Sequence, residues 1–373
     1  MKILVTGAGG FIGKNLIAEL RNRGYDELYC CDRDTSNEDL WQYLSDCDFV
    51  FHLAGINRPN NPNEFMEGNY DFTSMLLDGL KKQKNCVPVL MTSSVQAELD
   101  NPYGISKRAG EKALLAYGQE TDNRVLLYRL PNVFGKWCRP NYNSVVATFC
   151  HNIAHGLEIR IDNPDTVMSL AYIDDVVEEF IRGLEEKENR IGKICQVAVV
   201  YTVTLGKIAH LISSFKESRE NLMIPNMGYD LEKKLYSTYL SYLPEEEFSY
   251  LLKMNKDTRG SFTEFIKTPE RGQISVNISK PGVTKGNHWH HTKNEKFLVV
   301  HGKACIQFRK IDSTQVLEYH VSGDIMEVVD IPIGYTHNII NEGEEELVTV
   351  MWANETFEPE RSDTYFLKVV EDE

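Results

Sequence analysis

The segment KILVTGAGGFIG, Lys2 to Gly13, decides the fold of the first half of the chain. It begins with a short apolar run, KILVT, and Gly7, Gly10 and Gly13 follow with the spacing G-x-x-G-x-x-G. Glycines at this spacing let the backbone turn tightly after a strand and place a pyrophosphate on the N-terminal amides of the next helix, at the positive end of its dipole. The segment therefore predicts a strand, a phosphate-binding turn and a helix.

The alternation that starts in this segment continues to about residue 180. Short apolar runs such as ELYCCD, FVFHLAG, PVLMTSS and RVLLYRL are separated by amphipathic stretches such as GKNLIAELRNRG. This pattern indicates βαβ units, and we expect a doubly wound parallel sheet with helices on both faces, a Rossmann arrangement. Residues from about 200 to 245 are polar and mostly helical in pattern.

The pattern changes after the acidic, proline-containing segment LPEEEFSYLLKMNKD. Runs such as GQISVNIS, EKFLVVHG, KACIQFRKI and ELVTVMWAN are separated by short glycine-bearing turns, which is typical of a β-sandwich or barrel. A chain of 373 residues is also too long for one ordinary core. We therefore predict an α/β domain over residues 1–245 and an all-β barrel domain over residues 246–373.

Composition and charge limit the classes of partner. The formal net charge of −15 disfavours binding to nucleic acid through bulk electrostatics. No apolar run approaches the roughly 18 residues of a spanning helix, and no secretory signal precedes the first strand. We expect a cytoplasmic protein with no nucleic-acid partner and no membrane insertion, and its eight scattered cysteines are expected to be reduced thiols.

The run PVLMTSS and the segment YGISK after it suggest carbonyl chemistry. Tyr103 and Lys107 are four residues apart, so they share one face of a helix. A ketone that accepts a hydride develops an alkoxide, which needs a positioned proton donor. Tyr103 could supply the proton, and Lys107 as a cation would lower the tyrosine pKa and hold a ribose. The hydroxyl of Ser94, or failing that of Ser93, would bond the carbonyl oxygen.

The end of the second apolar run bears on the choice of nucleotide. Asp32 there could bond the ribose hydroxyls of NAD, whereas Arg33 could hold the 2′-phosphate of NADP. The residues alone leave both nucleotides open.

These residues together resemble the extended short-chain dehydrogenase/reductase family. DFVFHLAG resembles the adenine-side strand of that family, YRLPNVFG its R-x-x-N-x-(Y/F)-G segment, and YIDDVV a further landmark. The resemblance covers roughly residues 1–245 and implies that Asn132 contacts a sugar nucleotide. The residues that it implies for binding the dinucleotide are Gly7, Gly10, Phe11, Ile12, Gly13, Asp32, Arg33, Asp48, Leu53, Ala54, Tyr103 and Lys107.

The stretch KGNHWHHTKNEKF, Lys285 to Phe297, predicts a metal site in the second domain. Its histidines and glutamate have the spacing of the first cupin motif, and PIGYTHNIIN supplies the second motif. Alternate residues of a strand share a face, so two of the histidines can reach one ion. Three imidazoles and one carboxylate suit Zn²⁺, Fe²⁺, Mn²⁺ or Ni²⁺. The four predicted ligands are His288, His290, Glu295 and His337.

The second domain also resembles the nucleotide-sugar 3,5-epimerases, cupins that act on 4-keto-6-deoxy sugars. The similar segments are DTRGSFTEF and QISVNIS…KGNHWH. Lys285 occupies the place of the family's arginine and is expected to bind substrate, while His288 occupies the place of its general base. Because those epimerases need no metal, the base here stays open between a metal-bound hydroxide, His291, Lys293 and Tyr335.

Over its full length the chain is similar to a family of capsular polysaccharide enzymes with a reductase domain followed by a cupin. The resemblance implies a UDP-linked 2-acetamido-2,6-dideoxy-4-hexulose as substrate, C3 epimerisation in a zinc cupin and reduction of the C4 ketone with NADPH. The product would be UDP-2-acetamido-2,6-dideoxy-L-talose, on the path to UDP-N-acetyl-L-fucosamine, and the protein a homodimer or higher oligomer. Two alternatives stay open: a non-catalytic cupin for oligomerisation or sugar binding, and an iron dioxygenase.

Overall fold

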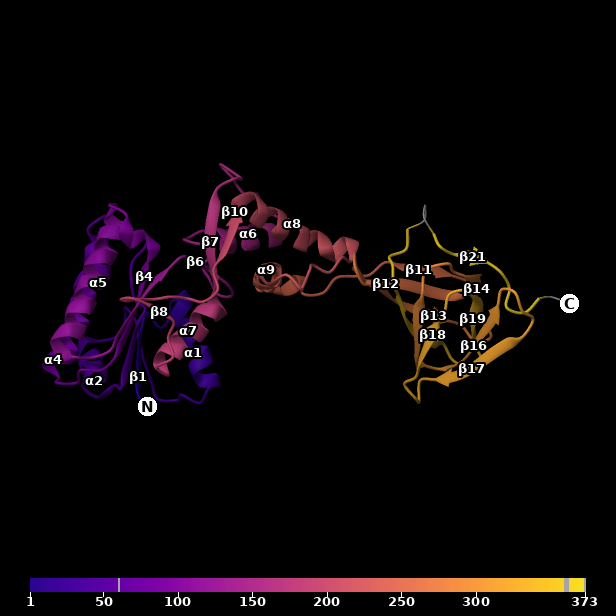
Figure 1. Cartoon of the computed structure of the whole chain (residues 1–373), viewed down its shortest axis with the longest axis horizontal. Helices are drawn as coiled ribbons and strands as arrows, with labels where there is room; N and C mark the ends of the chain where they lie inside the picture. Colours follow the sequence, from indigo (N-terminus) through magenta and orange to yellow (C-terminus); the bar gives the residue numbers. More distant parts are fainter. Residues whose placement is uncertain (60, 359–361, 372–373) are drawn as a thin grey trace. The chain divides into compact units, whose positions relative to one another are not determined.

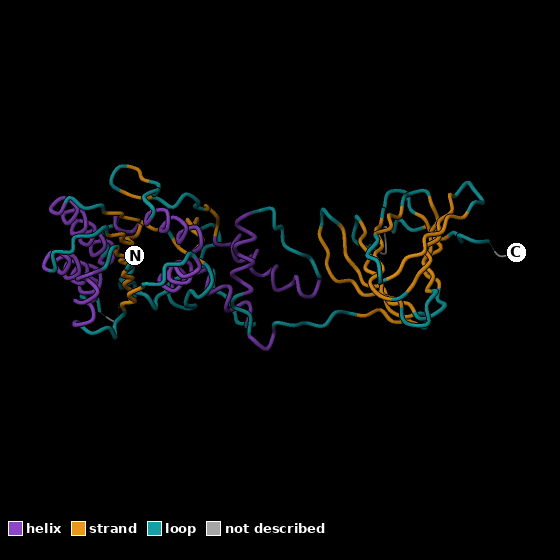
Figure 2. Tube along the Cα trace, turned by 90° about the horizontal axis from the view of Figure 1, so that it is seen from below, coloured by secondary structure: helices purple, strands orange, loops and turns teal. Residues whose placement is uncertain are grey.

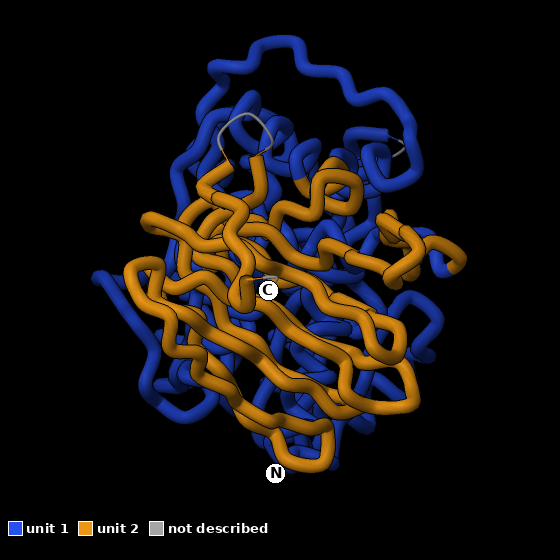
Figure 3. Tube along the Cα trace, turned by 90° about the vertical axis from the view of Figure 1, so that its right-hand side faces the viewer, with its two compact units in different colours: residues 1–214, 228–245 blue, residues 215–227, 246–373 orange. Residues whose placement is uncertain are grey.

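The structure, a computed structural model, describes residues 1–59, 61–358 and 362–371. The chain packs into two compact units, which are coloured separately in Figure 3. The first comprises Met1–Ser214 and Gly228–Glu245, and the second comprises Phe215–Met227 and Glu246–Glu373. The short segment 215–227, which the sequence placed in the first domain, packs with the second unit. The functional boundary after residue 245 stays a prediction.

The first unit is built on a sheet with the strand order β2-β1-β3-β4-β5-β9-β8. Neighbours from β2 to β5 pair in parallel, and the small β8–β9 hairpin at the edge is antiparallel. Every residue of β1 and β3 is buried, as expected for parallel strands that are covered on both faces. The strands are β1 (Ile3–Thr6), β2 (Leu28–Cys31), β3 (Phe49–His52), β4 (Val89–Ser94), β5 (Val125–Leu130), β8 (Arg190–Ile191) and β9 (Ile194–Cys195).

Helices cover both faces of this sheet, with α1 and α7 on one side and α2, α4 and α5 on the other (Figure 1). The strand β1 shows why two cores form, since Ile3 and Val5 join one apolar cluster while Leu4 joins the other. The helices are α1 (Phe11–Asn22), α2 (Asn37–Asp46), α3 (Glu64–Met66), the π-helical η1 (Glu67–Asp71), α4 (Phe72–Lys82), the 3₁₀ helix η2 (Val95–Glu98), α5 (Pro102–Thr121) and α7 (Ile173–Leu184). The predicted doubly wound α/β arrangement is confirmed.

A second, three-stranded sheet in this unit has the order β10-β7-β6. It consists of β6 (Asn132–Phe134), β7 (Val167–Tyr172) and β10 (Tyr201–Thr204), with β6 and β7 parallel and β7 and β10 antiparallel. The remaining helices are α6 (Val145–Ala154), α8 (Leu205–Asn221), α9 (Asp230–Leu240) and the 3₁₀ helix η3 (Glu245–Glu247). This sheet places Asn132, the predicted contact to a sugar nucleotide, at the start of β6.

The second unit is dominated by two antiparallel sheets, which appear as the strand-rich body at the C-terminal end of the chain in Figure 2. One has the order β11-β12-β13-β20-β15-β18 and the other the order β17-β16-β19-β14-β21. The apolar core draws on both, for example through Phe297 of β15 and Ile306 of β16. The strands are β11 (Met254–Asp257), β12 (Gly260–Thr268), β13 (Gly272–Ser279), β14 (Thr284–Trp289), β15 (Glu295–His301), β16 (Lys303–Lys310), β17 (Val316–Ser322), β18 (Val328–Ile331), β19 (Tyr335–Asn341), β20 (Leu347–Ala353) and β21 (Tyr365–Phe366).

The predicted all-β character of this region is confirmed, with the last turns of α8 and η3 as its helical parts among the described residues. Within the same described part of the chain, no helix is long and apolar enough to cross a membrane.

Candidate nucleotide and metal sites

The turn between β1 and α1 has the close backbone packing that its glycines predict. Gly7 has a φ of +68°, and a Cβ added to it would lie 2.9 Å from the Cα atom of Ala54. A Cβ on Gly13 would lie 2.2 Å from the carbonyl oxygen of Gly7. A side chain at Gly7 would clash with the backbone after β3, and one at Gly13 would push α1 away from the turn, so both positions require glycine. The turn brings the N-terminal amides of α1, from Phe11 to Gly13, to the carboxyl edge of the sheet, where an anion can bind.

The acidic residue after β2 is attached to this turn. The backbone N–H of Gly9 donates to Asp32 Oδ2 at 2.7 Å, which places the carboxylate at the edge of the nucleotide site. Arg33 is exposed beside it. The Asp32 carboxylate is suited to a ribose hydroxyl and the Arg33 guanidinium to a 2′-phosphate, so the two side chains fit either nucleotide.

The prediction for Asp48 is corrected. Its Oδ2 accepts a hydrogen bond from the backbone N–H of Lys2 at 2.7 Å, directly before β3 begins at Phe49. Asp48 therefore lies at the amino edge of the parallel strands, whereas dinucleotides bind at the carboxyl edge. Leu53 and Ala54, which follow the same strand, lie at the correct edge, where Leu53 lines the cavity and Ala54 packs on Gly7.

A cavity of about 740 Å³ at the carboxyl edge contains the three residues predicted to act on a carbonyl. Ser94 is the last residue of β4, and Tyr103 and Lys107 project from the start of α5. Asn101 fixes this start, because its Oδ1 accepts from the N–H of Gly104 at 2.8 Å. The Nζ atom of Lys107 lies 6.0 Å from the centroid of the Tyr103 ring. The structure thus brings the three residues together, while their roles stay predictions.

The hydrogen bonds separate Ser94 from Ser93. Both serines line the cavity, but the hydroxyl of Ser93 donates to Glu111 Oε1 at 2.6 Å, so its proton is already engaged. Ser94 accepts from the N–H of Gln96 at 3.2 Å, which leaves its own proton for a substrate oxygen. Ser93 therefore has a structural role, and Ser94 is the better candidate for the hydroxyl that bonds the carbonyl oxygen.

Burial sets the protonation of the two titratable groups. It raises the pKa of Tyr103, with the neighbouring Ser94 hydroxyl acting in the opposite direction. The sequence predicted that Lys107 lowers this pKa, whereas the largest effect on Tyr103 is desolvation. Burial also lowers the pKa of Lys107 to about 8, against an upward pull from Glu111. Glu111 is the buried charged neighbour that the motif did not reveal, although it follows Lys107 by one further turn of α5.

The cavity also contains Asn132, predicted to contact a sugar nucleotide, and a loop to which the sequence had assigned no role. The Asn132 amide donates to the carbonyl oxygen of Ser169 at 3.4 Å, which holds it at the edge of the cavity. Residues 137–139 and 142–144 line the same space. Within them, the guanidinium of Arg139 lies 5.0 Å from the centroid of the Tyr142 ring. An Arg–Tyr pair in this position is suited to an anionic, ring-bearing ligand.

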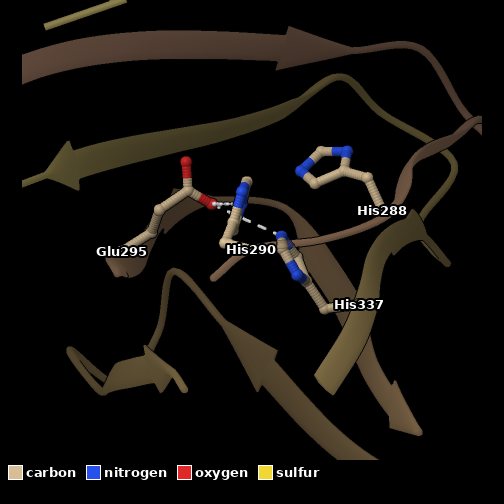
Figure 4. A group of neighbouring side chains, drawn as sticks. All are labelled: His288, His290, Glu295 and His337. Atoms are coloured by element: carbon tan, nitrogen blue, oxygen red, sulfur yellow. Dashed lines mark ion pairs between the residues drawn. The ribbon is translucent and has the colours of Figure 1, made fainter. Parts of the chain in front are cut away.

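In the second unit the four predicted ligands converge on one point, as Figure 4 shows. His288 and His337 are direct partners across β14 and β19, Glu295 opens β15, and His290 follows the end of β14. Glu295 Oε2 lies 3.6 Å from His290 Nε2 and 3.3 Å from His337 Nε2. One donor atom from each of the four residues lies within 4.8 Å of all the others.

These donor atoms fit a divalent cation. His290 Nε2, Glu295 Oε2 and both ring nitrogens of His337 are buried and make no hydrogen bond among the described residues, an arrangement that is costly unless a ligand satisfies them. Burial, helped by His337, lowers the pKa of His288 to about 3. Burial opposes ionisation of Glu295, but the neighbouring imidazoles and Lys293 hold its pKa well below its usual range. Neutral imidazoles with an ionised carboxylate are the forms that bind metals.

A cavity of about 650 Å³ opens on the ligands and has two lysines in its wall. Lys293 Nζ lies 3.0 Å from Glu295 Oε1, on the side of the carboxylate opposite the imidazoles. Lys285 Nζ donates to Asn277 Oδ1 at 2.7 Å and to the carbonyl oxygen of Ile278 at 2.9 Å. Of the three side chains considered as a base, Lys293 lines this cavity, while His291 packs against the rings of Trp289 and Tyr365 instead.

Comparisons with known proteins agree with both halves of the chain. Residues 3–198 match the NAD dependent epimerase/dehydratase family, and residues 255–365 match the polysaccharide biosynthesis C-terminal domain. The chain is 45% identical over 371 residues to a UDP-2-acetamido-2,6-beta-L-arabino-hexul-4-ose reductase of Pseudomonas aeruginosa, with 100% of both chains covered.

Solved structures give the same result. The capsular polysaccharide assembling protein CapF of Staphylococcus aureus is 51% identical, with a TM-score of 0.93 over 99% of this chain and 100% of that one. A UDP-glucose 4-epimerase of Thermotoga maritima is 20% identical, with a TM-score of 0.54 over 65% of this chain and 98% of its own length. That second likeness shows a shared fold for the nucleotide-binding region.

Proposed function

The chain belongs to the NAD dependent epimerase/dehydratase family, and from this premise we propose that it is a bifunctional enzyme acting on a UDP-linked 2-acetamido-2,6-dideoxy-4-hexulose. The second unit epimerises C3 of the sugar, and the first unit reduces the C4 ketone with NADPH. The product is UDP-2-acetamido-2,6-dideoxy-L-talose, a precursor of UDP-N-acetyl-L-fucosamine for surface polysaccharide. The observation that carries the proposal is that two separate cavities in one chain each hold groups suited to the same carbonyl.

In the first unit the chemistry is hydride addition to C4, for which the nicotinamide supplies the hydride. Tyr103 donates its phenolic proton to the C4 oxygen as negative charge develops there. Ser94 donates a hydrogen bond to the same oxygen and orients the carbonyl. Lys107 as a cation stabilises the tyrosinate that forms. Asn132 and the loop around Arg139 hold the sugar nucleotide in place.

In the second unit the chemistry is proton removal and return at C3. The 4-ketone acidifies the adjacent C3–H, and a divalent ion, proposed to be Zn²⁺, would act when bound as a Lewis acid toward the ketone oxygen. His288, His290, Glu295 and His337 would hold that ion. Lys293 is the best placed of the candidate groups to move a proton in this cavity, and Lys285 orders the wall against which the sugar lies.

Several finer assignments belong to this proposal. Arg33 at the rim of the nucleotide site supports NADPH over NADH, because a guanidinium is suited to the extra phosphate. The similarity to a cupin supports zinc in the second unit, and we propose a homodimer or a higher oligomer.

One observation favours a narrower function. The Pseudomonas aeruginosa relative is named for reduction alone, which would suit a chain in which the second unit only binds sugar or joins subunits around a structural metal. In that case the second unit would leave the C3–H of the substrate untouched.

The test is nuclear magnetic resonance of the sugar in deuterated water, with and without NADPH. The bifunctional enzyme should wash deuterium into C3 without NADPH, and with NADPH should also give the talo product. A His288→Ala/His337→Ala variant is the control and should lose the exchange. If the metal-loaded wild-type protein exchanged no deuterium into C3, the result would support the narrower function, reduction alone.

A further inference from the structure

A C-terminal segment of the second unit contacts the ligand cluster, although it lies far from the clustered motif in sequence. We propose that this segment, Ser362–Val369, which we call the C-terminal strap, holds the metal ligands in binding geometry through Asp363 as a positioning residue. The inference rests on the metal site of the proposed function and concerns how the chain prepares that site.

The first contact fixes one ligand. The backbone carbonyl oxygen of Asp363 is hydrogen-bonded to His290 Nδ1. A carbonyl oxygen can only accept, so Nδ1 must carry the proton. The neutral ring then has its lone pair on Nε2, the atom that faces Glu295 Oε2. The strap therefore selects the tautomer of His290 that can bind an ion and fixes the orientation of its ring.

The second contact fixes the turn between two ligands. The side-chain carboxylate of Asp363 accepts from the backbone N–H groups of His291, Thr292 and Lys293, at 3.0, 2.7 and 2.9 Å. It also accepts from the hydroxyl of Thr292 at 3.1 Å. Successive N–H groups that converge on one anion form a rigid nest. This turn joins His290 to Glu295, so one carboxylate sets the spacing of both ligands and the position of Lys293.

The rest of the strap is attached to the strand that carries His288. In β21, Phe366 pairs with His288 and Tyr365 with Trp289. The N–H of Leu367 donates to the carbonyl oxygen of Asn287 at 2.9 Å, and the N–H of Val369 to its Oδ1 at 3.2 Å. Val369 is fully buried. The strap thus contacts both the strand that carries His288 and the turn that leads to Glu295.

The strap also forms part of the cavity, because Ser362 and Thr364 line it on either side of Asp363. The same eight-residue segment therefore orders two metal ligands and shapes the wall that a sugar would meet. Docking of the strap and binding of the ion should stabilise each other, since a coupling between two events is reciprocal.

The experiment uses the full-length protein with Asp363→Ala and Asp363→Asn, and with Asp312→Asn, an exposed turn residue of the same unit, as the matched control. Zn²⁺ affinity is measured by competition with a chromophoric chelator, and the coordination by the visible absorption of the Co²⁺-loaded protein. We expect Asp363→Ala to bind Zn²⁺ about 10- to 100-fold more weakly and to change the Co²⁺ bands. Asp363→Asn, which keeps one acceptor oxygen, should lie between Ala and wild type, and the control should match wild type.

Hydrogen exchange tests the reciprocal effect in the wild-type protein. Removal of Zn²⁺ should speed exchange at the amides of Leu367 and Val369 by about tenfold or more, while amides of α1 stay unchanged. This measurement also decides the matter if Asp363→Ala fails to fold. Equal exchange with and without Zn²⁺ would overturn the proposal.

The remaining outcomes separate the strap from the catalytic proposal. An Asp363→Ala protein with Zn²⁺ affinity within twofold of wild type and unchanged Co²⁺ bands would overturn the positioning role, even if its thermal stability were lower. A wild-type protein that bound neither ion would remove the metal site and the strap's role together. A wild-type protein that bound Zn²⁺ and showed the expected effects at the strap, but exchanged no deuterium into the sugar, would contradict only the epimerase activity.

Discussion

The nucleotide site and the metal site differ in how their buried polar atoms are satisfied. In the first, such groups hold one another: His52 lies between the hydroxyls of Thr6 and Thr73, each at 2.8 Å, and Glu111 accepts from Arg129 at 2.9 and 2.7 Å. In the second, His290, Glu295 and His337 face one another with buried atoms that make no hydrogen bond. The groups named for the first site are satisfied within the protein, whereas those of the second would obtain their partner from the cation that we propose there.

The largest expected effect tests whether the two sites act separately. Tyr103→Phe removes the proton donor of the first site and keeps the ring, so reduction should fall by about 10²- to 10⁴-fold. The second site does not contain this residue, and deuterium exchange into C3 should continue at the wild-type rate. The measurement is NADPH oxidation followed optically, alongside NMR of the sugar.

The matched control is Tyr229→Phe, which alters the other Tyr-x-x-x-Lys pair of the chain and should leave both rates unchanged. Loss of reduction and exchange together in Tyr103→Phe would show that the two activities share a site.

Metal removal tests the contrast directly. An ion present at 1,000 times its Kd stabilises the folded state by about 4 kcal/mol, and for a unit of this size that corresponds to roughly 10 °C in Tm. A chelator should therefore lower the calorimetric transition of the second unit and leave that of the first in place. Addition of NADPH should raise the calorimetric transition of the first unit and leave that of the second in place. A single transition that shifts with both ligands would contradict independent sites.

The buried Glu111 offers a more moderate test of the first site. Burial lowers the pKa of Lys107 to about 8, and Glu111 opposes that effect. Since reduction needs the cation, the wild-type rate should fall as pH rises through about 8. Glu111→Gln removes the opposing charge, so the pKa of Lys107 should fall further, and the basic limb of the pH–rate profile should move down by about one pH unit.

The stability of this variant gives a second measurement. Glu111→Gln deprives the Arg129 guanidinium of its buried carboxylate partner, at a cost of about 1.5 to 3 kcal/mol in the free energy of unfolding. Glu120→Gln, on the exposed face of the same helix, is the control. In the wild-type protein the unfolded state, with a lysine pKa of 10.5, binds more protons than the folded state above pH 8. The contribution of Lys107 to stability therefore rises with pH from about 8 to 10.5. An unshifted profile in Glu111→Gln would show that the carboxylate only supports the fold.

The two sites also differ in how far they could be predicted from the sequence. The glycine turn and the Tyr103–Lys107 pair could be predicted because strand alternation and helix periodicity place such residues within one or two elements. The four proposed metal ligands could be predicted because the spacing of two segments matches the two cupin motifs. The prediction for Asp48 was wrong because it considered only that the residue lies next to a strand. It did not consider which end of the strand the residue adjoins. A residue that precedes a parallel strand faces the amino edge, away from the nucleotide.

The contacts that support each site could not be predicted in this way. Asp363 reaches the turn after His290, and Arg129 reaches Glu111, through pairings set by strand register and by the packing of whole elements. Register depends on the complete set of side chains in a sheet, and no short motif encodes it. The unassigned loop around Arg139 is a similar case, since its residues meet the cavity only after β6 and α6 are packed.

The smallest expected effect lies at the rim of the nucleotide site, where the side chains are exposed and the contrast in buried polar atoms no longer applies. Arg33 is exposed, and among the described residues it makes no hydrogen bond or ion pair, so it can turn toward a 2′-phosphate at little cost. A charge-assisted contact at such a position is worth about 1.5 kcal/mol, or roughly tenfold in affinity. Arg33→Ala should raise the KM for NADPH about tenfold and leave kcat and the KM for NADH unchanged, whereas Arg21→Ala, on the exposed side of α1, should change neither. Equal losses with both nucleotides would show that Arg33 supports the turn itself, and the site would then owe its nucleotide preference to Asp32.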